Sequence, residues 1–163
     1  MAWLDEHQPQ DVANCLIHND YRFDNFVLDK DDPTRILGIL DWEMATLGDP
    51  LMDLGGALAY WVQADDDEFM RGSRRQPTHA PGMLTRDEVW QYYAHASGRA
   101  ISPKDQLFYE IFGLFRLAVI AQQIYYRYAN GQTSNPAFKQ FRGMVIYLEW
   151  RCRRLMRRAG RLS

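Results

Sequence analysis

Apolar residues follow one pattern in the first forty positions and another in the rest of the chain. Short apolar runs at 14–17, 26–28 and 36–40 are bounded by polar residues, and this pattern predicts strands or strand-like segments. Asp31-Asp32-Pro33 separates the second run from the third and supplies turn residues. These two runs therefore predict a β-hairpin.

Beyond residue 48 the apolar positions recur at helical spacing, and each predicted helix has a start or stop signal. Residues 65–83 are rich in charge, Pro and Gly and predict a loop. Four helices are predicted: from Pro50 to about Gln63, from the capping box of Thr85 and Glu88 to Gly98, from Ser102-Pro103 to Tyr128, and from Asn135-Pro136 to about Arg158. The predicted fold class is α+β, mainly α-helical.

The polar residues that follow the first strands suggest chemistry on phosphate. The segment His18-Asn19-Asp20-Tyr21-Arg22-Phe23-Asp24-Asn25 follows the first run, and Asp41 follows the third. Phosphoryl transfer needs a carboxylate beside the acceptor hydroxyl and oxygen ligands that hold Mg²⁺ against the phosphates of ATP. The hairpin would hold Asn25 and Asp41 near one end of neighbouring strands, where a metal could sit. Asp20, Asn25 and Asp41 could supply this set.

The spacing of these residues resembles that of kinases. Asn25 lies five residues after Asp20, as in the protein-kinase loop, and a metal-binding Asp follows one hairpin later. The chain resembles the aminoglycoside phosphotransferase and choline kinase branch of the kinase-like superfamily, where the loop reads H-G-D-x-x-x-x-N. Two further segments carry this resemblance: Leu40-Asp41-Trp42-Glu43 and Gly48-Asp49-Pro50-Leu51-Met52-Asp53-Leu54. Within this branch the chain looks most like the kinase-like domains related to those fused to acyl-CoA dehydrogenases.

The resemblance implies a role for each residue of the loop. Asp20 would accept or orient the proton of the acceptor hydroxyl, and Asn25 and Asp41 would bind Mg²⁺. Arg22 would neutralise charge on the transferred phosphate or, alternatively, form a solvated pair with Asp24. The sequence departs from the family at Asn19, where Gly is usual; Asn tolerates a positive φ better than most residues do.

Four further residues would support this loop. His18 would hydrogen-bond the backbone near the metal-binding Asp rather than touch substrate. Asp49 and Asp53 would brace the loop and the next helix, and Asp49 before Pro50 is also typical of a helix N-cap. Glu43 could join the metal shell or pair with a base, and the sequence does not decide between these roles.

Residues 1–29 contain no Gly and no Lys. In kinases a Gly-rich loop and a strand Lys grip the nucleotide, and both precede the catalytic loop. We therefore expect residues 1–163 to form only the C-terminal, catalytic lobe of a kinase-like phosphotransferase, with the N-terminal ATP-gripping lobe absent and little turnover from this chain alone.

Composition narrows the choice of partners. A formal net charge of −2 argues against nucleic acid. We expect a cytoplasmic protein, because the chain has only two cysteines and no signal-peptide pattern. We expect no membrane span, because Arg116 interrupts the apolar stretch at 111–124.

The acceptor is a small hydroxylated molecule in this interpretation. The resemblance implies a hydroxyacyl-CoA or a similar metabolite. An aminoglycoside-like compound is less favoured because the C-terminal end is rich in Arg, although the acidic block at 65–68 could attract a cation. Two alternatives remain: a non-catalytic binding module that could form a homodimer, and a metal-dependent hydrolase that uses His18 and the aspartates.

Overall fold

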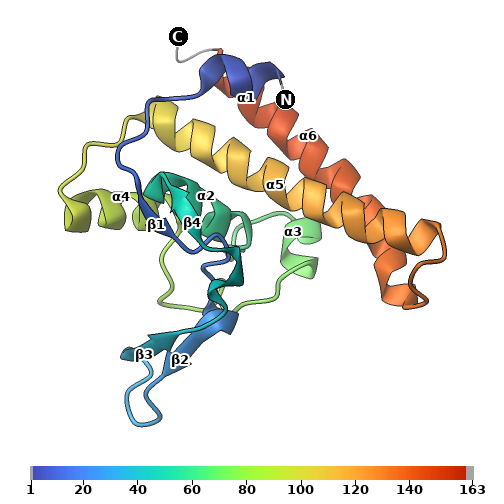
Figure 1. Ribbon diagram of the computed structural model, residues 1–163, viewed down its shortest axis with the longest axis horizontal. Helices are drawn as coiled ribbons and strands as arrows, with labels where there is room; N and C mark the ends of the chain where they lie inside the picture. Colours follow the sequence, from blue (N-terminus) through green and yellow to red (C-terminus); the bar gives the residue numbers. More distant parts are fainter. Residues whose placement is uncertain (1, 161–163) are drawn as a thin grey trace.

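The computed structural model describes residues 2–160. Two long helices, α5 and α6, lie side by side, and the β2–β3 hairpin projects away from them (Figure 1). The α-helices are α1 (Ala2–His7), α2 (Pro50–Ala59), α3 (Glu68–Gly72), α4 (Arg86–Ser97), α5 (Pro103–Ala129) and α6 (Phe141–Ala159). The strands are β1 (Cys15–Ile17), β2 (Phe26–Leu28), β3 (Ile36–Ile39) and β4 (Thr46–Gly48), and the 3-10 helices are η1 (Phe23–Asn25), η2 (Trp42–Met44) and η3 (Pro136–Gln140).

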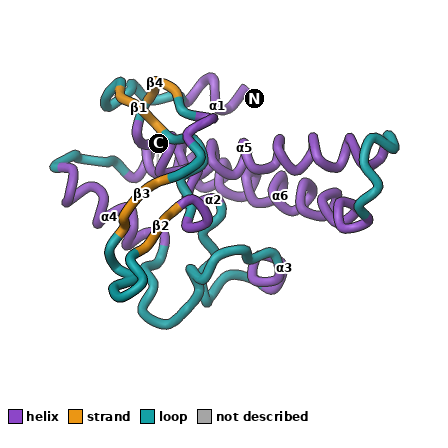
Figure 2. The backbone as a smooth tube through the Cα atoms, turned by 60° about the horizontal axis from the view of Figure 1, so that its bottom comes forward, coloured by secondary structure: helices purple, strands orange, loops and turns teal. Residues whose placement is uncertain are grey.

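The strands form two small antiparallel sheets, which Figure 2 shows as separate pairs. In the predicted hairpin, Phe26 pairs with Ile39, so the prediction is confirmed. The other sheet pairs Ile17 with Thr46, and the sequence analysis did not anticipate it. This second pairing brings the residues after β1 close to the start of α2.

The core lies where α5 packs against α2 and α6. Leu51 of α2, Ile111 of α5 and Leu148 of α6 are fully buried, and burial of such a side chain contributes about 1.5–3 kcal/mol. α2 and α5 cross very closely, because a Cβ atom at Gly113 would collide with the backbone oxygen of Gly55. This crossing fixes α2, which also carries residues of the site.

The predicted helix starts are confirmed where the side-chain caps could be read locally. Thr85 and Glu88 form the predicted capping box, and Gly98 ends α4 in the left-handed conformation. The Ser102 side chain accepts a hydrogen bond from the backbone N–H of Asp105 at the start of α5. Local side-chain chemistry therefore located these ends correctly.

Two helix boundaries differ from the predictions, and two short helices were not predicted. α2 ends at Ala59 rather than near Gln63, because the backbone N–H of Val62 donates to the hydroxyl of Thr78 in the following loop instead of continuing the helix. The predicted loop at 65–83 contains the short helix α3, which the side chain of Asp67 caps. The last helix starts as 3-10 turns and becomes α-helical at Phe141, and α1 was not predicted.

α5 is longer than the apolar stretch that the sequence analysis considered. By length and composition alone this 27-residue helix could cross a membrane. The same properties are typical of a core helix, which makes them weak grounds for a membrane span. In the described structure, Ile111 and Leu114 of α5 are buried in the core.

Candidate active site

The segment after β1 is held in its conformation by Asp53 of α2. The Asp53 carboxylate accepts hydrogen bonds from the backbone N–H groups of His18 (2.6 Å) and Asn19 (2.8 Å). Asn19 has a positive φ of 63°, a conformation that Asn adopts more easily than most residues. The bracing role predicted for Asp53 agrees with these contacts, and Asn at the usual Gly position is compatible with the loop.

The Asn19 side chain adds two contacts that the sequence analysis did not predict. Its amide nitrogen donates to the carbonyl of Met44 (3.0 Å), and its amide oxygen accepts from Arg116 of α5 (3.2 Å). A Gly at this position could make neither bond. Asn19 therefore ties the loop to η2 on one side and to α5 on the other.

His18 is buried and connects the loop to the residue before Asp41. Its Nδ1 accepts the backbone N–H of Asp20 (3.2 Å), so Nε2 carries the proton and donates it to the carbonyl of Leu40 (2.7 Å). Trp42 packs against the imidazole ring, with 4.7 Å between the ring centroids. This geometry agrees with the supporting role that was predicted for His18.

Asn25 lies between Asp20 and Asp41. Its amide nitrogen donates to the backbone carbonyl (2.7 Å) and the carboxylate (3.1 Å) of Asp20. The backbone carbonyl of Asn25 accepts the backbone N–H of Leu40 (2.8 Å). This bond places the next residue, Asp41, beside Asn25. The structure therefore brings together the three residues that the spacing selected.

The Asp41 side chain is not engaged by the rest of the described chain. It is exposed, has a positive φ of 66°, and makes no side-chain hydrogen bond to residues 2–160. A positive φ at a residue other than Gly costs on the order of 1 kcal/mol, so the conformation is held by its surroundings.

The donor set fits Mg²⁺, which usually takes one or two carboxylates, waters and the phosphates of a substrate. No group of three His, Cys, Asp or Glu side chains converges within residues 2–160. A fully protein-built cage is therefore not formed there, whereas a site shared with nucleotide phosphates needs only the oxygen atoms of Asn25 and Asp41.

Arg22 pairs with Asp20 in this structure. Its Nε and Nη2 lie 3.0 Å from the two carboxylate oxygens of Asp20, while Nη1 is 3.9 Å from Asp24. The guanidinium also lies 5.0 Å from the centroid of the Tyr60 ring. Of the two predicted roles, the Asp24 pair corresponds only to the longer of the carboxylate contacts, and the phosphate role stays a prediction.

Asp49 is almost completely buried and joins three parts of the chain. It accepts the N–H of Leu51 (2.7 Å) as the predicted N-cap, and also the N–H of Val12 (2.8 Å) and the hydroxyl of Tyr109 (2.9 Å). Burial, together with the carboxylate of Asp49, raises the pKa of Tyr109 above its usual value. The predicted capping of the helix start agrees with this geometry, whereas the other two bonds of Asp49 go to Val12 and Tyr109 rather than to the catalytic loop that it was expected to brace.

Glu43 is exposed in the first turn of η2 and makes no side-chain hydrogen bond to the described residues. Its two predicted roles both stay predictions.

The acidic block at 65–68 is largely engaged in ion pairs and caps. Arg86 donates two hydrogen bonds to Asp66 (2.8 and 2.6 Å), and Arg151 lies 3.7 Å from the same carboxylate. Burial is the largest single influence and acts to raise the pKa of Asp66, but the hydrogen bonds from Arg86 and the Gln63 backbone, together with the charges of Arg86 and Arg151, hold that pKa below its usual value. Asp67 accepts the hydroxyl of Tyr147 (2.6 Å) and caps α3. These two carboxylates are therefore poorly placed to attract a cationic substrate.

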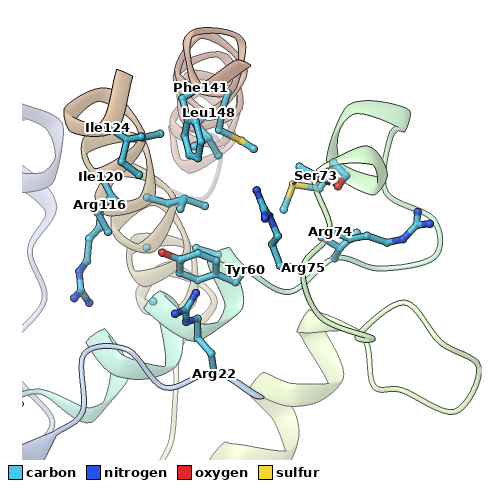
Figure 3. A pocket seen from close by; sticks show the side chains of 18 of the residues that line it. Arg22, Tyr60, Ser73, Arg74, Arg75, Arg116, Ile120, Ile124, Phe141 and Leu148 are labelled. Carbon is cyan, nitrogen blue, oxygen red and sulfur yellow. Dashed lines mark hydrogen bonds between the residues drawn. The ribbon is translucent and has the colours of Figure 1, made fainter. Parts of the chain in front are cut away.

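A cleft of about 1370 Å³ opens beside Asp20. Its basic side chains include Arg22, Arg75 and Arg116, and its apolar wall comes from α5 and α6 (Figure 3). The sequence analysis named neither Arg75 nor Arg116 as a site residue. The only sequence feature that could have indicated Arg75 was the pair of adjacent arginines at 74 and 75 in the charged loop. The fold decides which of these two side chains points into the cleft.

This arrangement of a buried His, a left-handed turn, an Asp–Asn pair and a hairpin that returns a second Asp resembles the catalytic-loop region of kinase-like phosphotransferases. The model of the phosphotransferase enzyme family matches residues 1–89. The chain belongs to this family.

The chain is similar to curated proteins and to a solved structure. It is 36% identical over 142 residues to acyl-CoA dehydrogenase family member 10 of Mus musculus, covering 86% of this chain and 13% of the relative. It is 33% identical over 146 residues to acyl-CoA dehydrogenase family member 11 of Homo sapiens, covering 88% and 18%. The chain therefore spans less than a fifth of the length of these relatives.

The similar structure comes from Ralstonia eutropha and is assigned as an aminoglycoside phosphotransferase. It superposes with a TM-score of 0.72 at 33% identity, over 93% of this chain and 46% of that one. The mainly helical α+β fold and the relationship to kinase-like phosphotransferases, both predicted from the sequence, are confirmed.

Proposed function

We propose that this chain carries the catalytic loop of an ATP- and Mg²⁺-dependent phosphotransferase that acts on a hydroxyl group of a small molecule. The observation that carries the proposal is that the backbone at Asp41 lies beside the hydrogen-bonded pair of Asp20 and Asn25. The Asn25 amide lies 3.1 Å from the Asp20 carboxylate, and the Asn25 carbonyl accepts the N–H of the residue before Asp41.

Each residue has a distinct task in this proposal. Asp20 takes the proton of the acceptor hydroxyl as the phosphoryl group arrives, and Asn25 and Asp41 hold the metal through oxygen. The bound Mg²⁺ would neutralise charge on the phosphates of ATP. Arg22 forms an ion pair with Asp20, so it must leave at least one carboxylate oxygen free when the acceptor binds. Once released, its guanidinium lies near the transferred phosphate.

We expect the isolated 163 residues to turn over slowly or not at all. In the family the nucleotide is gripped by a Gly-rich loop and a Lys that precede the catalytic loop, and residues 1–29 contain neither residue type. A longer protein that includes such a lobe is the form in which to measure activity. A cytoplasmic location and the absence of a nucleic-acid partner stay predictions.

A second candidate function is a non-catalytic binding module. It is favoured by exposed apolar side chains on the strands: Leu16 is 62% exposed, Leu37 56% and Leu47 69%. Large exposed apolar surfaces are typical of contact with another chain or domain. A stable homodimer without ATP binding in any form of the protein would favour this alternative.

The test compares Asp20→Asn and Asp41→Asn with the matched control Asp24→Asn in the longer protein. Asp24 lies in the same loop and is exposed, so its change removes an equal charge outside the converging group. Loss of a general base lowers the rate by about 10²–10⁴-fold, and we expect this for Asp20→Asn while stability changes little. Asp41→Asn should weaken Mg²⁺ binding and therefore raise the Mg²⁺ concentration that is needed for half-maximal activity.

ATP-dependent phosphorylation of hydroxylated acceptors is followed by phosphate transfer from labelled ATP. The proposal fails if Asp20→Asn keeps its rate within a few-fold of the parent, or if Asp24→Asn loses as much as Asp20→Asn does.

A further inference from the structure

The cleft beside Asp20 has an apolar wall and a charged rim. Ile120 and Ile124 of α5 and Phe141 and Leu148 of α6 lie along the apolar wall (Figure 3). Asp20 lies in the lining of the same cleft. A ligand with its hydroxyl at Asp20 can therefore lay a hydrocarbon segment against α5 and α6.

The arginines of the cleft differ in what already holds them. Arg22 is paired with Asp20, and Arg116 donates to the side chain of Asn19. Arg75 makes no hydrogen bond or ion pair to the residues that the structure describes, and its side chain points into the cleft (Figure 3). Arg75 is therefore the guanidinium that is available to a ligand.

The neighbour of Arg75 behaves differently. The Arg74 side chain points away from the cleft, and its Nη1 donates to the carbonyl of Arg71 (3.0 Å). Glu68, in the first turn of α3, is the carboxylate of the lining that is nearest to Arg75 in sequence, and it makes no side-chain hydrogen bond or ion pair to residues 2–160. Two adjacent residues of the same type therefore offer one candidate ligand contact and one matched control.

We infer that Arg75 selects an acceptor that carries an anionic group, carboxylate or phosphate, joined to its hydroxyl by an aliphatic segment. This inference rests on the proposed phosphotransferase function and specifies the acceptor. A guanidinium binds either anion with charge-assisted hydrogen bonds, and the wall formed by α5 and α6 covers the aliphatic part. A polycationic acceptor is disfavoured, because it would place like charge against the unpaired guanidinium of Arg75.

Binding is measured by calorimetry on the full chain without nucleotide. The probes are 10-hydroxydecanoate and 10-hydroxydecyl phosphate, with methyl 10-hydroxydecanoate and 10-aminodecan-1-ol as the neutral and cationic controls. The parent should bind the two anions more tightly than either control. Whichever anion binds more tightly identifies the group that Arg75 recognises.

Arg75→Gln should weaken binding of the preferred anion by about tenfold, the loss expected for one charge-assisted contact at an open site. Arg75→Lys should recover part of that affinity, and Arg74→Gln should leave it unchanged. Arg75 is exposed, so these changes should not alter folding, which circular dichroism verifies. Equal affinities for anionic, neutral and cationic probes, or an unchanged affinity in Arg75→Gln, would overturn the inference.

A transfer assay in the longer protein separates this inference from the proposed function. Arg75-dependent binding of the anion without any transfer to its hydroxyl would contradict the phosphotransferase proposal alone. Equal transfer to neutral and cationic acceptors, unaffected by Arg75→Gln, would contradict the acceptor assignment alone.

Discussion

The close crossing of α2 and α5 gives a prediction that links packing to the site. In Gly113→Ala the new methyl group would meet the backbone oxygen of Gly55, with the N atom of Gly56 3.2 Å away. Backbone atoms cannot rotate aside as the end of a flexible side chain does, so the two helices must separate. Overpacking of this kind costs about 1–3 kcal/mol, and a rigid neighbour places this case at the upper end.

The same substitution has a favourable component. Replacing Gly by Ala inside a helix stabilises it by about 1 kcal/mol, so the net loss of unfolding free energy should be about 2 kcal/mol. With a urea m-value of about 2 kcal/mol/M, the midpoint Cm should fall by about 1 M at unchanged m. Gly143→Ala in α6 is the control, because its nearest neighbour is a Phe69 side-chain atom at 3.9 Å.

The displacement should also reach the catalytic loop. α2 carries Asp53, whose carboxylate fixes the N–H groups of His18 and Asn19, and a shift of about 1 Å can cost on the order of 10²-fold in rate. Urea unfolding of both variants, followed by the transfer assay, tests the whole chain of reasoning. A Gly113→Ala protein as stable as Gly143→Ala would refute it.

Two further substitutions test the hydrogen bonds that hold the site. Asp53→Asn keeps one acceptor oxygen but turns an N–H group toward the loop, so the free energy of unfolding should fall by about 1–3 kcal/mol. Amide hydrogen exchange at His18 and Asn19 should become faster. Unchanged exchange at these two residues would contradict the bracing role. Tyr109→Phe removes a bond to the buried Asp49 carboxylate and should cost about 1.5–3 kcal/mol at neutral pH. Because the folded-state pKa of Tyr109 is raised, this contribution is full below the unfolded pKa of about 10 and is lost as pH rises through the folded pKa. In urea denaturation, the difference in unfolding free energy between the parent and Tyr109→Phe should therefore narrow as the pH rises through the folded-state pKa. A difference that widens would contradict the assignment.

The sequence predicted features that depend on residues close together in the chain. The caps at Thr85 and Ser102 use contacts three residues apart, and the hairpin uses an adjacent turn. Helix ends that depend on distant partners were predicted less well. α2 stops early because Val62 bonds to Thr78, sixteen residues away.

The acidic block shows the same limit in the site. As a run of like charges it suggested an open surface for a cation. Folding brings Arg86 of α4, Tyr147 of α6 and Arg151 of α6 to it, over separations of 20 residues for the Asp66–Arg86 bonds and 80 for Asp67–Tyr147. No local sequence pattern predicts pairing over such separations. The carboxylates of Asp66 and Asp67 could therefore be identified as internal partners only from the packed helices.

The sequence by itself determined the class of this protein, because the order and spacing of Asp20, Asn25 and Asp41 are set along one short stretch of chain. Only the tertiary structure decided how that stretch is held and what it faces. Asp53 reaches it from α2 and Arg116 from α5, and Arg75 enters the cleft from a loop. These contacts arise when distant elements pack, and the free energy of packing depends on shapes that linear spacing does not contain.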